Sequence, residues 1–326
     1  MRLAIMLPCY QEEATIAETV SAFARARPDA VIYVYDNNST DRTAERAAAA
    51  GAIVRHEARQ GKGNVMRRAF ADIEADIYVM CDGDATYDAS RVDDLIRLVV
   101  EDKIDMVVGA RVPVDETSHR TGHAFGNTLF NRIADWLFGS EFTDIFSGYR
   151  AFSRRFVKSL PIITDGFEIE TELTVHAIDL RVPVAEVRLP FGKRPEGSAS
   201  KLRTARDGLR ILWALLLLTK EVRPFSFFAF WGGLAAIVSL VLAYPLVVTF
   251  LQTGLVPRLP TAVLATGMAL LAFLSLGCGI VLDSVSRGRH EVKRLRYLEI
   301  AAPDFGQHHC QPLDRKRSCQ PPPSRG

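Results

Sequence analysis

Short apolar segments alternate with amphipathic segments through the N-terminal part of the chain. The apolar segments are rich in β-branched and aromatic residues, which is typical of strands. Predicted strands lie at Leu3–Leu7, Val31–Tyr35, Ile53–Arg55, Ile77–Met80 and Met106–Val108. Predicted helices lie between them, at Ala14–Ala26, Asp41–Ala50, Val65–Ile73 and Arg91–Glu101. Strands that alternate with helices indicate the α/β class, with a doubly wound, mostly parallel sheet.

Two uncharged apolar stretches follow near the C-terminus, at Phe225–Phe250 and Leu259–Leu282. Each is longer than the roughly 20 residues that a helix needs to cross a bilayer. Arg258 is the only charged residue in the short turn between them, whereas basic residues flank both outer ends. The outer basic residues are Lys220, Arg223, Arg287, Arg289, Lys293, Arg294 and Arg296. The positive-inside rule therefore predicts a transmembrane hairpin in the cell membrane with both termini, and the domain before it, in the cytoplasm.

These patterns divide the chain into four parts. We expect a cytosolic catalytic domain over residues 1–203 and an amphipathic helix over 204–223, lying on membrane lipid with Trp213 at the interface. This segment contains a third, shorter apolar run at Ile211–Leu218, and a core helix of the soluble domain is the alternative for it. The hairpin takes residues 224–286, and a basic tail over 287–326 is expected to be partly disordered.

Charge and cysteine content exclude several functions. The chain has 40 Lys and Arg against 38 Asp and Glu, a net charge of +2, whereas a dedicated nucleic-acid-binding protein is usually strongly basic. Its five cysteines are scattered, without the spacing of a disulfide scaffold or a zinc site. We therefore expect no nucleic-acid partner.

Polar residues follow every predicted strand. Because the carboxyl ends of parallel strands meet at one edge of a sheet, these residues should converge on one ligand site. The segments are Pro8–Glu13, Asp36–Ser39, Gly61–Gly63, Asp82–Asp84 and Gly109–Arg111.

The pair Asp82 and Asp84 suits a hard divalent cation. Residues two apart on a strand share a face, and two adjacent carboxylates repel unless a cation joins them. Gly83, between them, allows close approach to the backbone, and Lys62 between two glycines could meet a phosphate at a helix N-terminus. The P-loop and dinucleotide-binding motifs are absent.

Together the motifs resemble family 2 glycosyltransferases with the GT-A fold, and within them the polyprenyl-phosphate branch typified by dolichyl-phosphate mannose synthase. The resemblance covers roughly residues 1–220. It rests on Pro8-Cys9-Tyr10-Gln11-Glu12, Tyr35-Asp36-Asn37-Asn38-Ser39-Thr40-Asp41, Gly61-Lys62-Gly63, Asp82-Gly83-Asp84, Phe146-Ser147-Gly148-Tyr149-Arg150 and the segment Arg194–Lys201.

The resemblance implies roles for the donor site. Asp36 would contact the nucleobase, and Pro8, Tyr10 and Glu12 would shape the base and ribose pocket. Lys62, Asp82 and Gly83 would face the nucleotide-sugar, while Asp82 and Asp84 would hold Mg²⁺ or Mn²⁺ on its diphosphate. Three departures bear on the donor: Gln11 replaces Asn, Thr86 often is Gln, and Asn37 replaces an Asp, which removes one negative charge beside the base.

The resemblance also implies an acceptor site. Residues expected to bind the acceptor phosphate are Arg111, Arg120, Arg150, Arg194, Ser200 and Lys201. Asp144 is a further catalytic candidate. Glu168, Glu170 and Glu172 are the residues on which a relative that uses a general base would draw; here they could instead bind donor-sugar hydroxyls or be structural. A polyprenyl phosphate is already anionic, so it needs positioning rather than deprotonation.

The predicted function is inverting, metal-dependent transfer of a sugar from a nucleotide-sugar to a polyprenyl phosphate at the cytoplasmic membrane face. A UDP-sugar is favoured over a GDP-sugar. One alternative is a family 2 enzyme with another lipid-linked or saccharide acceptor, and another is a non-catalytic membrane adaptor. The chain could form a homo-oligomer.

Overall fold

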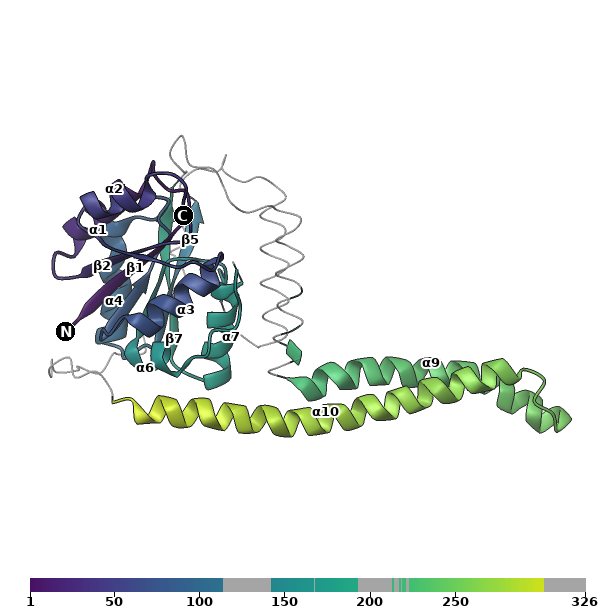
Figure 1. Ribbon diagram of the computed structural model, residues 1–326. Coiled ribbons are helices and arrows are strands. Elements are labelled where there is room, and N and C mark those ends of the chain that lie inside the picture. Colours follow the sequence, from purple (N-terminus) through teal and green to yellow (C-terminus); the bar gives the residue numbers. More distant parts are fainter. Residues whose placement is uncertain are drawn as a thin grey trace, which may run out of the picture.

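The structure is a computed structural model of the 326-residue chain, and it describes residues 1–113, 142–166, 168–192, 213, 217, 219–220 and 223–301. An α/β domain at one end joins a long helical hairpin at the other (Figure 1). The predicted helix over 204–223 lies almost wholly outside the described residues. Two of its described side chains, Trp213 and Leu217, are exposed.

A seven-stranded sheet forms the centre of the domain, in the order β3-β2-β1-β4-β6-β5-β7. All its strands run parallel except β6, which is antiparallel to both β4 and β5. The mostly parallel sheet is therefore confirmed, whereas β6 and β7 were not predicted. The strands are β1 Leu3–Cys9, β2 Val31–Asp36, β3 Ile53–His56, β4 Ile77–Met80, β5 Met106–Pro113, β6 Arg150–Ser153 and β7 Val184–Phe191.

Helices cover both faces of this sheet. On β1, Ala4 and Met6 join one apolar cluster while Leu3, Ile5 and Leu7 join the other, because successive side chains point to opposite faces. The first cluster packs α3, α6 and α7 against the sheet, and the second packs α1 and α4. The helices are α1 Ile16–Ala26, α2 Thr43–Ala49, α3 Lys62–Asp72, η1 Ala89–Arg91, α4 Val92–Val100, α6 Arg154–Ser159 and α7 Ile169–Leu180.

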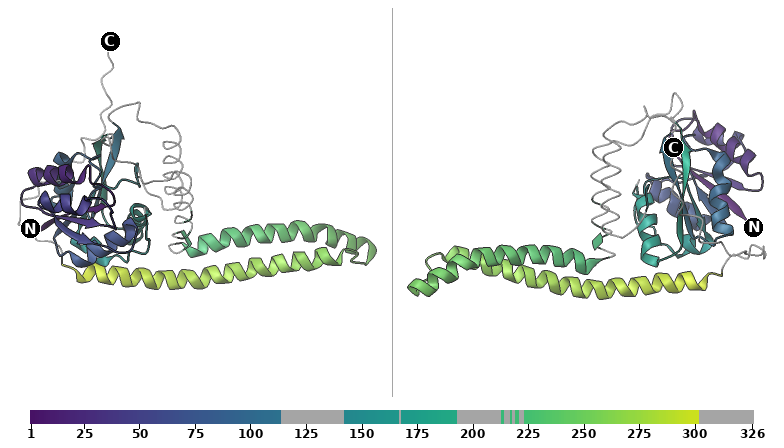
Figure 2. Two further views of the ribbon diagram at one scale, coloured as in Figure 1. Left: turned by 45° about the horizontal axis from the view of Figure 1, so that its top comes forward. Right: turned by 180° about the vertical axis from the view of Figure 1, so that it is seen from behind.

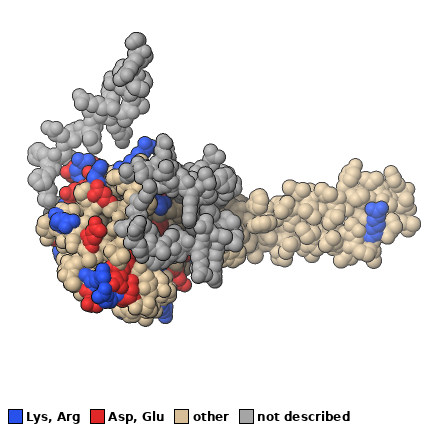
Figure 3. Space-filling model, turned by 90° about the horizontal axis from the view of Figure 1, so that it is seen from above, with Lys and Arg blue, Asp and Glu red and all other residues tan. Residues whose placement is uncertain are grey.

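The two long C-terminal helices are α9 Pro224–Thr253 and α10 Leu259–Glu299. Both are long and apolar enough to cross a membrane, and only 17 % of the apolar window in each is buried. Figure 3 shows their surface without Lys, Arg, Asp or Glu along most of its length, apart from a basic residue near the tip.

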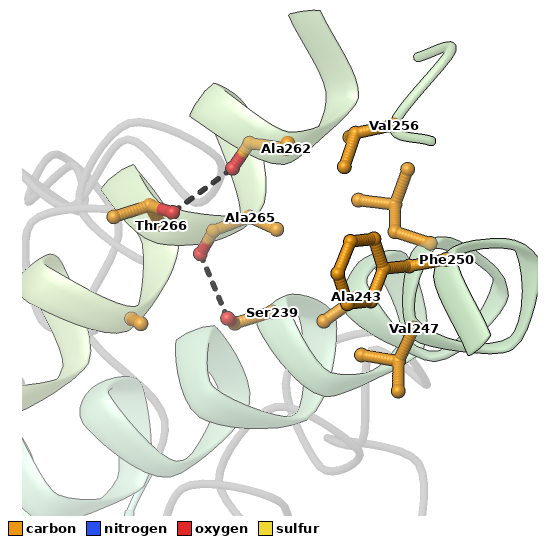
Figure 4. A pocket seen from close by; sticks show the side chains of 10 residues that line it. Ser239, Ala243, Val247, Phe250, Val256, Ala262, Ala265 and Thr266 are labelled. Atoms are coloured by element: carbon orange, nitrogen blue, oxygen red, sulfur yellow. Dashed lines mark hydrogen bonds between the residues drawn. The ribbon is translucent and has the colours of Figure 1, made fainter. Parts of the chain in front are cut away.

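Small residues let α9 and α10 approach closely. Ser239 Oγ donates to the carbonyl of Ala265 at 2.7 Å, and a Cβ at Gly232 would lie 3.1 Å from the carbonyl of Ala272. Towards the tip the two helices line an apolar groove of about 520 Å³, to which Val247 and Phe250 contribute (Figure 4).

Helix α10 continues well beyond the apolar stretch and returns to the α/β domain (Figure 2). Its charged end packs along α6 and α7: Lys293 Nζ and His290 Nδ1 lie 3.2 and 3.0 Å from the Asp179 carboxylate. Tyr297 Oη donates to Asp105 at 2.8 Å. The tail predicted to begin at residue 287 is therefore helical to Glu299, because these pairs anchor it, and residues 302–326 lie outside the described part.

Candidate active site

The predicted convergence at the carboxyl edge of the sheet is found in the structure. The turn after β1 is tied to the turn after β2, since Gln11 N donates to Ser39 Oγ at 3.0 Å and Glu12 N to Thr43 Oγ1 at 2.9 Å. The turn after β4 joins them, because Thr15 Oγ1 donates to the carbonyl of Gly83 at 2.9 Å. Pro8 and Tyr10 lie at the same edge, at the end of β1 and directly after it.

Asp36, the last residue of β2, carries a buried oxygen that has no hydrogen-bond partner among the described residues, Oδ1. The other oxygen, Oδ2, accepts from Ser39 N at 3.3 Å and lies 3.4 Å from His56 Nδ1. The side chain of Asp36 is 8 % exposed. A buried acceptor without a donor is costly, so this oxygen is suited to a ligand N–H.

Asn37 has a structural role at the end of β2. Its Nδ2 donates to the carbonyls of Glu57 and Arg59, both at 2.8 Å, and its Oδ1 accepts from Gly61 N at 2.7 Å. Its side chain ties the end of β2 to the loop that enters α3. An aspartate could not make the two donations, which explains the amide at this position.

Two glycines place Lys62 at the first position of α3. Gly61 has φ +128°, which favours glycine, and a Cβ there would collide with the carbonyl of Asp165. Gly63 N donates to the carbonyls of Asp165 and Gly166 at 3.0 and 3.1 Å. The segment before α7 thus fixes the N-terminus of α3.

The Lys62 ammonium bridges Asp82 and Glu170, and its side chain is only 9 % exposed. Burial alone would lower the pKa of Lys62, but the two carboxylates outweigh it and the pKa is raised. Burial raises the pKa of Glu170, which Lys62 counters in part. The lysine therefore stays protonated at neutral pH.

The Asp82-Gly83-Asp84 turn is closely packed. A Cβ at Gly148 would lie 2.5 Å from Asp82 Oδ2, and one at Gly83 would lie 2.5 Å from Cys9 Sγ. Asp84 is buried, and its Oδ1 accepts from Thr86 N at 3.2 Å and Thr86 Oγ1 at 2.6 Å. A side chain at either glycine would therefore displace the side chain that faces it.

A divalent cation at this turn would take its remaining ligands from water or from a substrate. Within the described residues, three or more His, Cys, Asp or Glu side chains nowhere gather as a metal site. Asp82 and Asp84 supply two carboxylates, and Mg²⁺ typically uses one or two carboxylates together with substrate phosphates. The pair thus suits an ion that can also bind a diphosphate.

Arg111 and Asp144 form a bidentate pair, with Nε–Oδ2 and Nη2–Oδ1 distances of 2.7 Å. Arg111 N and Phe146 N also donate to the Asp144 carboxylate. Burial works against ionisation of Asp144, but the bonds from Arg111 prevail and its pKa is lowered. Asp144 is therefore an ionised carboxylate that orients Arg111, and these contacts favour positioning over direct contact with reacting atoms.

Arg150 corrects a prediction. Its side chain is fully buried, so it cannot reach an acceptor phosphate in this structure. The guanidinium donates from Nε to the carbonyl of Ser147 at 2.8 Å, from Nη1 to Thr174 Oγ1 at 2.9 Å and from Nη2 to the carbonyl of Ile145 at 2.6 Å. Arg150 holds the loop that carries Asp144 against α7.

Two of the three predicted glutamates, Glu170 and Glu172, are buried, and their contacts differ. Glu172 is buried, and it accepts from Ile163 N at 2.7 Å and Thr164 N at 2.9 Å, so it is structural. Glu170 reaches the site through Lys62, and its spacing from Lys62 in the sequence gave no signal of that contact. The predicted acceptor residues Arg120, Arg194, Ser200 and Lys201 lie outside the described residues.

Known proteins identify the class to which this site belongs. The family described as Glycosyl transferase family 2 matches residues 4–160. Glycosyltransferase AglJ of Haloferax volcanii is 33 % identical over 304 residues, which is 90 % of this chain and 97 % of that protein. The hexosyltransferase Agl6 of low-salt glycan biosynthesis in the same organism is 29 % identical over 74 % of this chain and 59 % of its own length.

A solved structure with the same fold is glucosyl-3-phosphoglycerate synthase from Mycobacterium tuberculosis in complex with Mn²⁺, UDP and glucosyl-3-phosphoglycerate. It has a TM-score of 0.57 and 25 % identity, and the match covers 67 % of this chain and 80 % of that one. The chain belongs to glycosyl transferase family 2. It is a glycosyltransferase whose catalytic domain has the GT-A fold.

Proposed function

We propose that this enzyme transfers a sugar from a UDP-sugar to a polyprenyl phosphate at the cytoplasmic face of the membrane, with inversion at the anomeric carbon. The observation that carries the proposal is the union of two features in one chain. The proposed nucleotide-sugar site of Asp36, Lys62, Asp82 and Asp84 lies in a domain to which a hairpin of membrane-spanning length is docked. An enzyme so anchored meets a soluble donor and a lipid acceptor together.

The environment of Asp36 favours uracil as the base. Its oxygen Oδ1 lacks a partner among the described residues while Oδ2 is already engaged by Ser39 N. Uracil presents a single imide N–H, which one free oxygen satisfies. Guanine presents two neighbouring donor groups, which would call for both oxygens.

Titration calorimetry with Mn²⁺ tests this assignment. We expect UDP to bind more tightly than GDP. Asp36→Asn should weaken UDP binding by about ten-fold, because an amide has a single acceptor oxygen and cannot accept from both Ser39 N and the imide N–H. Asp29→Asn, which changes an exposed carboxylate paired with Arg27, is the matched control. Equal affinity of the wild type for UDP and GDP would contradict the assignment.

The acceptor site is proposed around Arg111. Asp144 fixes its guanidinium, and a guanidinium fork suits phosphate oxygens. We propose that the site is completed by Arg120, Arg194, Ser200 and Lys201. Arg150 supports the site by holding the loop that carries Asp144. Since the acceptor phosphate is already anionic, a side chain that removes a proton is not needed, which agrees with the lowered pKa of Asp144.

The donor diphosphate is proposed to lie between Lys62 and the Asp82-Gly83-Asp84 turn. When bound, Mg²⁺ or Mn²⁺ would supply charge neutralisation to the departing nucleotide. Asp82 and Asp84 would hold that ion, and Lys62 would bind the diphosphate from the opposite side. The mycobacterial enzyme with the same fold is in complex with Mn²⁺ and UDP, which supports the use of a divalent cation together with a nucleoside diphosphate.

The cytoplasmic orientation is also part of the proposal. Arg258 is the only charged residue in the turn between α9 and α10, whereas several basic residues flank the other ends of the two helices. Sealed membrane vesicles test it, because a UDP-sugar does not cross the bilayer. Inside-out vesicles should form labelled lipid from external donor, and right-side-out vesicles that do so equally would overturn the orientation.

A further inference from the structure

Lys62 is shared between two carboxylates that come from different parts of the fold. Asp82 follows β4 at the proposed metal turn, and Glu170 lies in the first turn of α7. The ammonium contacts Asp82 Oδ1 and Glu170 Oε1 together, in a place where Glu170 is 6 % exposed and Asp82 is 31 % exposed. Asp82 thus faces the open side of the site, and Glu170 lies behind Lys62.

This arrangement conflicts with metal binding at Asp82. An ammonium and a divalent cation repel, and close approach is costly in a partly buried site. An ion held by Asp82 and Asp84 is therefore bound more tightly when Lys62 withdraws from Asp82. Its side chain is long and rotatable, so the withdrawal needs no backbone movement.

Glu170 is placed to retain the lysine during that change. The N-terminus of α3 is bonded to the segment before α7 through Gly63 N, so Lys62 and Glu170 belong to one rigid unit. Thr174 Oγ1 donates to the carbonyl of Glu170 at 2.9 Å and accepts from the buried Arg150, which fixes the first turn of α7. Asp82 belongs to a different part of the fold, after β4 and beside Gly148.

We propose that Glu170 is a positioning residue that holds the Lys62 ammonium in the cleft when a divalent cation takes over Asp82, so that the lysine meets the donor diphosphate. The proposal rests on the proposed function, which places the cation and the diphosphate at this turn. Lys62 then exchanges its contact with Asp82 for one with the diphosphate and keeps its contact with Glu170. Without Glu170, Lys62 would pair with Asp82 alone and compete with the cation.

The test is to measure Mn²⁺ binding to the full-length protein by the paramagnetic resonance signal of the free ion, without nucleotide. Lys62→Met removes the competing ammonium, so Mn²⁺ should bind about ten-fold more tightly. In Glu170→Gln, Lys62 would pair with Asp82 alone, so Mn²⁺ should bind about ten-fold more weakly. In calorimetry at saturating Mn²⁺, Lys62→Met should also weaken UDP binding. Lys103→Met is the control for loss of a positive charge elsewhere.

The double variant separates action through Lys62 from a direct effect of the Glu170 charge on the ion. In the Lys62→Met background, Glu170→Gln should leave Mn²⁺ affinity unchanged, because the intermediary is gone. A Glu170→Gln effect of the same size in both backgrounds would overturn the proposal, as would unchanged Mn²⁺ affinity in both single variants. Thermal unfolding of each variant confirms that it is folded.

Failure here is distinguishable from failure of the proposed function. The assays contain only Mn²⁺ and UDP, so a wrong acceptor leaves their results unchanged. Normal Mn²⁺ binding with unresponsive variants would overturn the role of Glu170 alone. A wild type that binds no Mn²⁺ would overturn this inference together with the metal site.

Discussion

Asp84→Asn is expected to lower the rate of sugar transfer by about a thousand-fold, which corresponds to about 4 kcal/mol of lost transition-state stabilisation. The substitution keeps the size of the side chain and an oxygen that can accept from Thr86 N and Oγ1, so the fold should persist. It removes one negative charge from the turn that would hold the divalent cation. The measurement is the initial rate of product formation at saturating donor, with and without excess Mn²⁺.

Asp88→Asn is the matched control for this variant. Asp88 is exposed and caps η1 by accepting from Ser90 N at 2.9 Å, a role that asparagine fills equally well. Its transfer rate should match that of the wild type. EDTA should abolish wild-type transfer and Mn²⁺ or Mg²⁺ should restore it. A wild type that is insensitive to EDTA, or Asp84→Asn at full rate, would contradict metal-dependent catalysis at this turn.

Arg150→Met should destabilise the catalytic domain by about 3–5 kcal/mol, because the carbonyls of Ser147 and Ile145 would lose a buried, charged donor. The corresponding fall in melting temperature is roughly 10 °C, measurable by thermal unfolding in detergent. Arg150→Lys should rescue little, since an ammonium cannot reproduce the guanidinium fork. An exposed arginine of β7, Arg188, provides the control variant Arg188→Met.

The effect of Arg150→Met should not depend on pH near neutrality. Burial lowers the pKa of Arg150 to about 10, while Glu170 and Asp144 act in the opposite direction. The pKa in the unfolded chain is higher still, so the side chain is protonated in both states between about pH 6 and 8 and stability carries no slope from it there. If Arg150→Met were as stable as Arg188→Met, the structural role of Arg150 would be wrong.

The sequence predicts the parallel part of the sheet well because its strands are continuous apolar segments. The register of β1, β2, β3 and β4 brings the polar residues that follow them to one edge, as parallel strands require. The apolar C-terminal helices are similarly evident from length alone. In each case a local pattern determines the element.

The remaining features depend on contacts between residues far apart in the sequence. β6 is short and lies between β4 and β5, so only its partners reveal it as a strand. Arg150 lies in a motif that resembles a phosphate-binding segment, and only the surrounding carbonyls show that its charge is used internally. The link from Lys62 to Glu170 joins residues 108 positions apart, which periodicity cannot indicate.

The end of α10 and the amide of Asn37 show the same limit. A basic run after an apolar stretch is typical of a solvated tail, but Asp179 and Asp105 on the catalytic domain give Lys293 and Tyr297 partners that extend the helix. Asn37 lies beside Asp36 in the sequence, yet its side chain points to the β3–α3 loop. Neighbours in a turn therefore serve different purposes.

The most direct test of the proposed reaction is a transfer assay with purified protein in detergent, using labelled UDP-sugars, Mn²⁺ and undecaprenyl phosphate. We predict that label from one UDP-sugar enters the organic phase, that GDP-sugars donate poorly, and that undecaprenol without its phosphate accepts none. Transfer to undecaprenol, or binding of a UDP-sugar without transfer to undecaprenyl phosphate, would contradict a polyprenyl-phosphate acceptor.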